Sequence, residues 1–118
     1  IMEQTQNMAR DMARAAVLAL EEKKGEDPCV IDVSQISIMT DYFVIAHGNS
    51  DSQVRALVDN VDEKMQEAGY VLRQQEGKGG TWVLMDYGDV IVHVFDKEGR
   101  AFYNLERIWS DGKTVEEL

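Results

Sequence analysis

The stretch from Thr81 to Asp96 limits the possible folds more than any other part of the chain. Two apolar runs rich in β-branched residues, 81–85 and 90–95, flank the turn Asp86-Tyr87-Gly88-Asp89, and this pattern predicts a β-hairpin. Both runs are apolar at nearly every position, so each strand presents apolar side chains on both of its faces. A strand of this kind is covered on both sides, and we therefore expect the hairpin to be central in its sheet.

Outside the hairpin, the apolar pattern alternates between helical and extended periods. The predicted helices are 5–24, 50–68 and 97–104, and the further predicted strands are 29–33, 41–47 and 70–76. The second helix has the strongest start signal, because Ser50 and Gln53 fit a capping box, and Gly69 is its expected C-cap. The glycine-rich segment 74–80 is predicted to be a mobile loop, and the tail 110–118 is predicted to be loose.

The apolar side of each helix follows from its spacing. In the first helix, Thr5 is the predicted N-cap and the apolar stripe is Met8, Met12, Ala16 and Leu20. In the second, the stripe is Val54, Leu57, Val58, Val61, Met65 and Ala68. The third helix, capped by Asp96, has the apolar side Ala101, Phe102, Leu105 and Ile108, and Trp109 is expected to fold back onto the body.

These elements predict one α/β domain spanning residues 1–118, with a mixed central β-sheet covered by amphipathic helices. A chain of 118 residues, 44 % of them hydrophobic, has the length and the composition of a single globular domain. No internal repeat and no linker divides the sequence. The ends, 1–4 and 112–118, are expected to be loose.

The charge of the chain restricts its partners. The formal net charge is −10 at pH 7, which argues against direct binding to nucleic-acid phosphates and favours a basic protein as the partner. Simple solubility explains the charge about as well. No apolar run approaches the ~20 residues of a membrane span, and no leader is recognisable. The single cysteine, Cys29, fits a reducing compartment, so we expect a cytoplasmic protein.

Three carboxylates near the hairpin provide a catalytic alternative. Asp41, Asp86 and Asp89 carry the oxygen ligands that divalent cations prefer, and segment 48–50, between a strand and a helix, is placed to bind a phosphate. This order of elements resembles the nucleotidyltransferase plan, which implies adjacent Gly-Ser residues and two Asp at alternate positions of one strand. Here Asn49 separates the Gly from the Ser, and a turn separates the two Asp, so nucleotide transfer is the weaker hypothesis.

The two histidines, His47 and His93, are the side chains that titrate nearest to neutral pH. His93 shares a strand face with Ile91 and Phe95, which favours a core histidine over a catalytic one. The sequence has no Cys–His cluster for zinc, and segment 77–80 lacks the Gly-Lys-Ser/Thr order of a phosphate-binding loop. We therefore predict no metal and no cofactor.

The hairpin tip is also suited to protein recognition. Tyr and Trp are favoured anchors of interfaces, and a tight turn is expected to display Tyr87 between two carboxylates that can pair with Arg or Lys. The alternative is that Asp86 and Gly88 only satisfy the backbone geometry of a surface turn. The sequence leaves both interpretations open.

Several long motifs resemble one known family. They are 40–46 (TDYFVIA), 48–55 (GNSDSQVR), 82–95 (WVLMDYGDVIVHVF) and 100–109 (RAFYNLERIW). Together they resemble the ribosomal silencing factor family, RsfS, also called Iojap. The resemblance extends from Met8 to Asp111 and keeps the order and spacing of the motifs, which makes it highly specific.

The resemblance implies a fold similar to that of nucleotidyltransferases without their catalytic carboxylate pattern, and a protein that is not an enzyme. It implies binding to the large ribosomal subunit through large-subunit ribosomal protein fourteen. A domain bound there blocks association with the small subunit and represses translation. It also implies a bacterial, cytoplasmic protein that can form a homodimer when free. The expected partner-binding residues are Trp82, Asp86, Tyr87, Asp89 and His93, with Asp41 and Tyr42 as neighbours.

Overall fold

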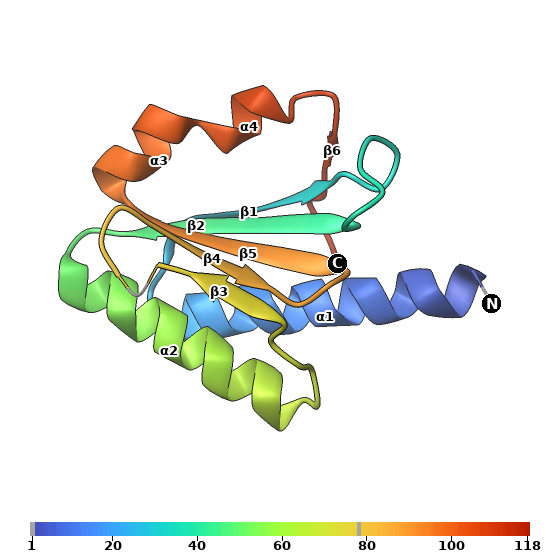
Figure 1. The fold of residues 1–118 in the computed structure, drawn as a ribbon, viewed down its shortest axis with the longest axis horizontal. Helices are drawn as coiled ribbons and strands as arrows, with labels where there is room; N and C mark the ends of the chain where they lie inside the picture. The colour runs from blue at the N-terminus through green and yellow to red at the C-terminus, as the bar shows by residue number, and fades with distance from the viewer. Residues whose placement is uncertain (1, 78) are drawn as a thin grey trace.

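Residues 2–77 and 79–118, which this computed structural model describes (without the side chains of residues 2–6), form a six-stranded β-sheet with helices on both faces (Figure 1). The strands are β1 (Glu26–Asp32), β2 (Tyr42–Gly48), β3 (Gln74–Glu76), β4 (Trp82–Asp86), β5 (Val90–Asp96) and β6 (Lys113–Thr114). The helices are α1 (Met2–Glu22), α2 (Asp51–Glu67), α3 (Lys97–Tyr103) and α4 (Leu105–Ile108). Within the described residues, no helix is both long and apolar enough to cross a membrane.

The sheet is mixed, as predicted, with the strand order β3-β4-β5-β2-β1-β6. Its centre is the parallel pair of β2 and β5, in register from Tyr42 opposite Val90 to Gly48 opposite Asp96. The other strand pairs are antiparallel, including the β4–β5 hairpin. One arm of the predicted hairpin is therefore a central strand, and α2 lies in the connection that makes the parallel pairing possible.

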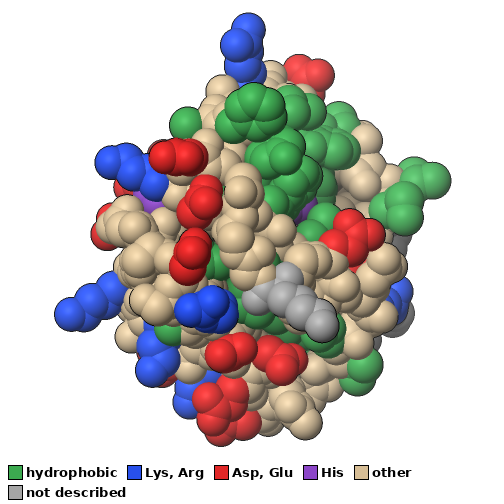
Figure 2. All heavy atoms as spheres, turned by 60° about the vertical axis from the view of Figure 1, so that its left-hand side comes forward, with side chains coloured by type: hydrophobic (Ala, Val, Ile, Leu, Met, Phe, Trp, Pro, Cys, Tyr) green, Lys and Arg blue, Asp and Glu red, His purple; other side chains and the backbone are tan. Residues whose placement is uncertain are grey.

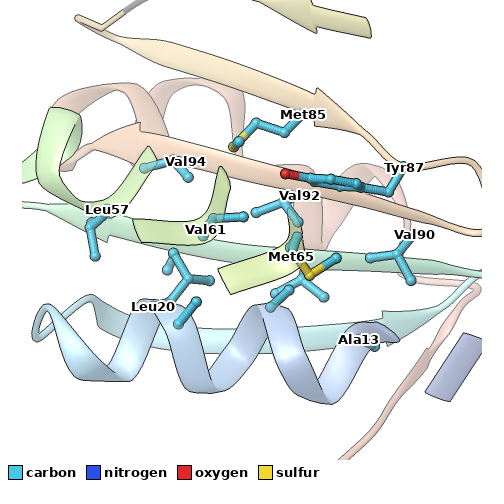
Figure 3. Packing of buried hydrophobic residues seen from close by; sticks show 14 of the residues in the cluster. Ala13, Leu20, Leu57, Val61, Met65, Met85, Tyr87, Val90, Val92 and Val94 are labelled. Carbon is cyan, nitrogen blue, oxygen red and sulfur yellow. The ribbon is translucent and has the colours of Figure 1, made fainter. Parts of the chain in front are cut away.

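One face of the sheet is covered by α1 and α2 (Figure 1). The predicted stripe of α2, apart from the exposed Ala68, is buried there with Leu20 of α1 and alternate residues of the strands, among them Val92 and Val94 (Figure 3). The predicted start of α2 is also confirmed, because Ser50 Oγ accepts a hydrogen bond from the Gln53 amide at 3.1 Å. The Gln53 side chain reaches back to the Asn49 amide at 2.7 Å, which completes the cap.

The opposite face of the sheet is covered only in part, by the short helices α3 and α4 (Figure 1). Beneath them lies a second core of Ile31, Val33, Phe43, Ile45, Phe95 and Leu105. Trp109 folds back as expected, and its ring meets that of Phe43 edge-on, with the ring centroids 4.9 Å apart. Because these helices are short, apolar side chains near them remain open to solvent.

Several predicted boundaries were wrong. Strand β3 covers only Gln74–Glu76, the last part of the predicted strand 70–76 and the start of the segment predicted to be a mobile loop, where the edge of β4 offers a pairing partner. Strand β1 begins at Glu26 rather than at residue 29 and passes Pro28 through an irregularity in its pairing with β2. Local turn signals did not reveal either pairing.

The chain ends also differ from the prediction. The tail 110–118 is tied down: β6 pairs with β1, and the Val115 amide donates a hydrogen bond to the Val30 carbonyl at 2.8 Å. Helix α1 begins at Met2, before the predicted cap at Thr5, so residues 2–4 are helical rather than loose. Met8 is exposed, because small alanines such as Ala9 and Ala13 form the buried stripe of α1. Residue 1 and residue 78 of the predicted loop lie outside the described residues.

Candidate interaction surface

The hairpin tip is organised by a hydrogen bond within the turn. The Asp86 carboxylate accepts a hydrogen bond from the Gly88 amide at 2.8 Å, and the Tyr87 amide donates to the Val90 carbonyl at 2.9 Å. Gly88 has φ +90°, a conformation that residues with a Cβ rarely adopt. These contacts support the turn-forming interpretation for Asp86, whose carboxylate is already engaged.

Tyr87 is buried, so the expectation that the turn displays it was wrong. Only 3 % of the residue is exposed, and its ring lies in the core under α2, near Met65 and Val92 (Figure 3). Burial, and secondarily the charge of Asp62, raises the pKa of the phenol. Within the described residues its hydroxyl has no hydrogen-bond partner. Tyr87 therefore anchors the tip from inside rather than presenting a ring to a partner.

A substitution of Gly88 tests the geometry of this turn. A Cβ at Gly88 would lie 2.7 Å from the guanidinium carbon of Arg73, whereas a Cβ at Gly69, with φ +89°, meets nothing within 4 Å. We expect both substitutions to lower the free energy of unfolding by about 1–2 kcal/mol, the cost of a Cβ at positive φ, because the Arg73 guanidinium ends a flexible, exposed side chain and can move away from the new methyl group. Urea denaturation measures both, and adding Arg73→Ala should leave the cost of Gly88→Ala unchanged. A Gly88→Ala cost well above that of Gly69→Ala, relieved by Arg73→Ala, would show that Arg73 is held in place.

The acidic residues of the predicted site lie beside one another at this end of the sheet. The carbonyl of Asp89 accepts hydrogen bonds from the amides of Asp41 and Tyr42, at 2.9 and 3.1 Å. Burial, followed by the charges of Asp89 and Asp32, raises the pKa of the Asp41 carboxyl. Tyr42 is buried. In the part of the chain that the structure describes, no three His, Cys, Asp or Glu side chains are placed to hold a metal ion together.

The phosphate alternative at segment 48–50 is not favoured by the geometry. A helix N-terminus binds anions through its free amides, but the Asn49 and Gln53 amides are already bonded to the side chains of Gln53 and Ser50. His47, at the same end of β2, lies 3.1 Å from Arg100 through its Nδ1 atom. Burial, and then the Arg100 charge, lowers the pKa of His47. The second histidine, His93, contacts Trp82 and Phe43 instead of Arg100, so the two histidines do not form one site.

Trp82 and His93 lie away from the tip, on the face of the sheet that α3 and α4 cover only in part. Trp82 is paired with Phe95 at the open end of the hairpin, four residues and about 13 Å along β4 from Asp86. The Trp82 indole N–H donates to His93 Nδ1 at 3.1 Å, which leaves the ring proton of neutral His93 on Nε2. The seven predicted residues therefore form two groups, an acidic one at the tip and an aromatic one at the open end.

Burial of His93 predicts a loss of stability in weak acid. Only 3 % of His93 is exposed, and burial lowers its pKa to about 4. The unfolded chain, with an ordinary histidine pKa near 6.5, binds this proton first, so stability falls as the pH drops below about 6.5. We expect His93 to remove about 2 kcal/mol of unfolding free energy between pH 7 and pH 5. Between pH 7 and pH 5, the unfolding free energy of the His93→Gln variant should fall by about 2 kcal/mol less than that of wild type. An equal fall in the two proteins would contradict a neutral buried His93.

The partly covered face carries a patch of exposed and half-buried apolar side chains that includes the half-buried Trp82. Helices α3 and α4 add the exposed Phe102 and Ile108 and the partly exposed Tyr103. The Tyr103 ring lies 4.6 Å from that of Trp82 and 5.0 Å from that of Phe102, and Leu84 follows Trp82 on the same face of β4. We call Trp82, Leu84, Phe102, Tyr103 and Ile108 the aromatic patch. Figure 2 shows hydrophobic side chains gathered on this side of the molecule, bordered by acidic side chains.

Four members of the patch were missed by the sequence prediction. Phe102 and Ile108 were placed on the apolar side of their helix, and Leu84 and Tyr103 were not singled out. Helix α3 buries only Gly99 of its residues, and Phe102 and Tyr103, which point about 100° apart, are both left exposed. Two neighbouring aromatics in a helix of only seven residues are the signal that could have identified an exposed anchor.

The chain is similar to known proteins over nearly its whole length. Residues 6–118 match the family described as ribosomal silencing factor during starvation, RsfS. The protein named ribosomal silencing factor RsfS of Halalkalibacterium halodurans is 43 % identical over 108 residues, which are 91 % of this chain and 92 % of that protein. A mouse protein named mitochondrial assembly of ribosomal large subunit protein 1 is 33 % identical over 100 residues, 80 % of this chain and 43 % of its own.

The fold agrees with the same relationship. A crystal structure of protein CV0518 from Chromobacterium violaceum superimposes with a TM-score of 0.83 at 37 % identity, covering 86 % of this chain and 85 % of that one. The family match spans both helical layers and all the strands of the sheet. From its sequence and its fold, the chain belongs to the RsfS family of ribosomal silencing factors.

Proposed function

We propose that the protein binds the large ribosomal subunit through large-subunit ribosomal protein fourteen and sterically blocks association with the small subunit. The family is one of ribosomal silencing factors, and one relative carries assembly of the large ribosomal subunit in its name. Silencing of this kind requires a bound obstacle and no chemical step. We propose accordingly that the protein acts in the cytoplasm by binding and represses translation without catalysis.

The aromatic patch is the observation that carries this proposal. Contiguous exposed apolar surface on a rigid element marks interaction sites, and Trp and Tyr are the residues that most often dominate binding energy. Trp82 is fixed from below by its hydrogen bond to His93 and by stacking on Phe95 at 5.2 Å. A side chain held in this way loses little conformational entropy on binding.

The seven predicted partner-binding residues contribute in different ways to this proposal. Trp82 supplies a half-buried aromatic anchor, and Asp41 and Asp89 supply negative charge toward a basic ribosomal protein. Asp86 shapes the tip through its turn hydrogen bond. The buried residues Tyr42, Tyr87 and His93 support these groups from within. When the protein is free, we propose that a second copy covers the same patch in a homodimer.

A subunit-joining experiment tests the proposal. Purified large subunits are mixed with the protein in excess, small subunits are added, and joining is followed by light scattering. We expect the scattering increase to be suppressed in proportion to the fraction of large subunits that carry the protein. An unrelated acidic protein at the same concentration should have no such effect, which controls for non-specific interference. Normal joining with large subunits that are saturated with the protein would overturn the proposal.

A further inference from the structure

A second exposed apolar feature lies in the connection between β1 and β2, residues 33–41, at the end of the sheet that carries the hairpin tip. Ile38 is fully exposed, Met39 is 81 % exposed, and Ile36 is 44 % exposed. We call residues 33–41 the apolar loop. Its three exposed apolar side chains are distinct from the aromatic patch, which lies around Trp82 and α3.

The apolar loop is held in a defined shape by hydrogen bonds. The Val33 amide donates to the Asp41 carbonyl and the Ser37 amide to the Val33 carbonyl, both at 2.8 Å. The Met39 amide donates to Ser37 Oγ at 3.1 Å. The loop therefore exposes Ile38 and Met39 from a fixed backbone, and a partner meets a preorganised surface.

The charge beside the loop identifies the kind of partner. A recess of about 250 Å³ next to the loop is lined by Asn7, Arg10, Asp32, Ser34, Gln35, Asp41 and Tyr42. Asp32 is partly engaged, since it accepts hydrogen bonds from the amide and hydroxyl of Ser34. Asp41 is repelled by Asp89 and Asp32, and this repulsion, after burial, raises the pKa of Asp41. Arg10 also lines the recess, but it already donates a hydrogen bond to the Glu117 carbonyl at 2.9 Å, and the two carboxylates leave the lining with a net charge of −1. An incoming cation would relieve the repulsion at Asp41, whereas a phosphate group would add to it.

We infer that the apolar loop is a second docking point, which receives a basic segment of a ribosomal protein on the large subunit. A Lys or Arg of that segment enters the acidic recess beside Asp41, and its aliphatic neighbours cover Ile38 and Met39. This inference rests on the proposed function and adds a contact outside the hairpin. Two separated contacts on one rigid domain fix its orientation on the subunit, which an obstacle to subunit joining requires.

Binding of labelled protein to purified large subunits, measured at several salt concentrations, tests the inference. We expect the double variant Ile38→Ser/Met39→Ser to bind about tenfold more weakly, as loss of a modest contact predicts, with an unchanged melting temperature because both side chains are exposed. Asp41→Asn should bind severalfold more weakly and with a smaller dependence on salt. Leu18→Ser, at an exposed leucine of α1, is the matched control and should bind within about twofold of wild type.

The outcomes separate the inference from the proposed function. If wild-type protein binds and Trp82→Ala weakens binding, while the double variant binds like Leu18→Ser, the loop inference is wrong and the proposed function stands. Tighter binding by Asp41→Asn would show that the loop faces ribosomal RNA, and this result would also overturn the loop inference. If wild-type protein does not bind large subunits, both proposals are wrong.

Discussion

Leu57→Ala should lower the free energy of unfolding by about 2–5 kcal/mol, the range for removing a buried leucine side chain and leaving a cavity. Leu57 is fully buried in the middle of the α2 stripe, between α1 and the sheet (Figure 3). Neighbours from α1, α2 and β5 meet there, so no single element can move to fill the space. Thermal and urea denaturation measure the effect.

The control for Leu57→Ala is the same substitution at Leu18, which is 56 % exposed on α1. Leu18→Ala should change the unfolding free energy by less than about 0.5 kcal/mol, as for most surface positions. A melting temperature of Leu57→Ala equal to that of Leu18→Ala would show that the α2 stripe is not packed on the sheet.

Trp82→Ala should weaken binding to the large ribosomal subunit by about 30- to 1,000-fold, the loss expected of a central aromatic anchor worth about 2–4 kcal/mol. The reason is the position of Trp82 within the aromatic patch: its ring stacks on Phe95 of the sheet and lies beside Tyr103 of α3. The dissociation constant can be measured with labelled protein and purified subunits, and subunit joining should recover in parallel.

Two further variants make this result specific. Trp82→Phe keeps most of the apolar surface and loses the hydrogen bond to His93, so it should bind with intermediate affinity. Leu18→Ala removes exposed apolar surface from the other layer of the molecule and should bind like wild type. If Trp82→Ala remains folded by circular dichroism and binds like Leu18→Ala, the aromatic patch is not the docking surface.

The sequence predicted the elements that depend on local pattern. The α2 stripe, the capping box at Ser50 and the hairpin were all readable, because each is encoded by residues close together in the chain. Strand β6 was not, because it is only two residues long and exists through pairing with the distant β1, and of the predicted strand 70–76 only Gln74–Glu76 pairs, with β4. The predicted loose tail was wrong for the same reason.

The candidate site was only partly readable. Residue type and position identified Trp82 and the acidic tip, but an aromatic residue in a tight turn looks the same whether its ring points outward or inward. Tyr87 points into the core because α2 lies over that face of the hairpin, and turn chemistry contains no information about that helix. The exposed aromatics of α3 depend likewise on how little of the sheet the short helix covers.

The parallel pairing of β2 with β5 also limits the order of events during synthesis. Tyr42 to Gly48 must wait for a partner that lies nearly half the chain later, at Val90 to Asp96. Contacts between such distant segments form slowly, and a newly made chain lacking β5 leaves one edge of β2 unpaired. We therefore expect truncated chains that end before residue 90 to aggregate, and nascent chains to need most of their length outside the exit tunnel before they fold.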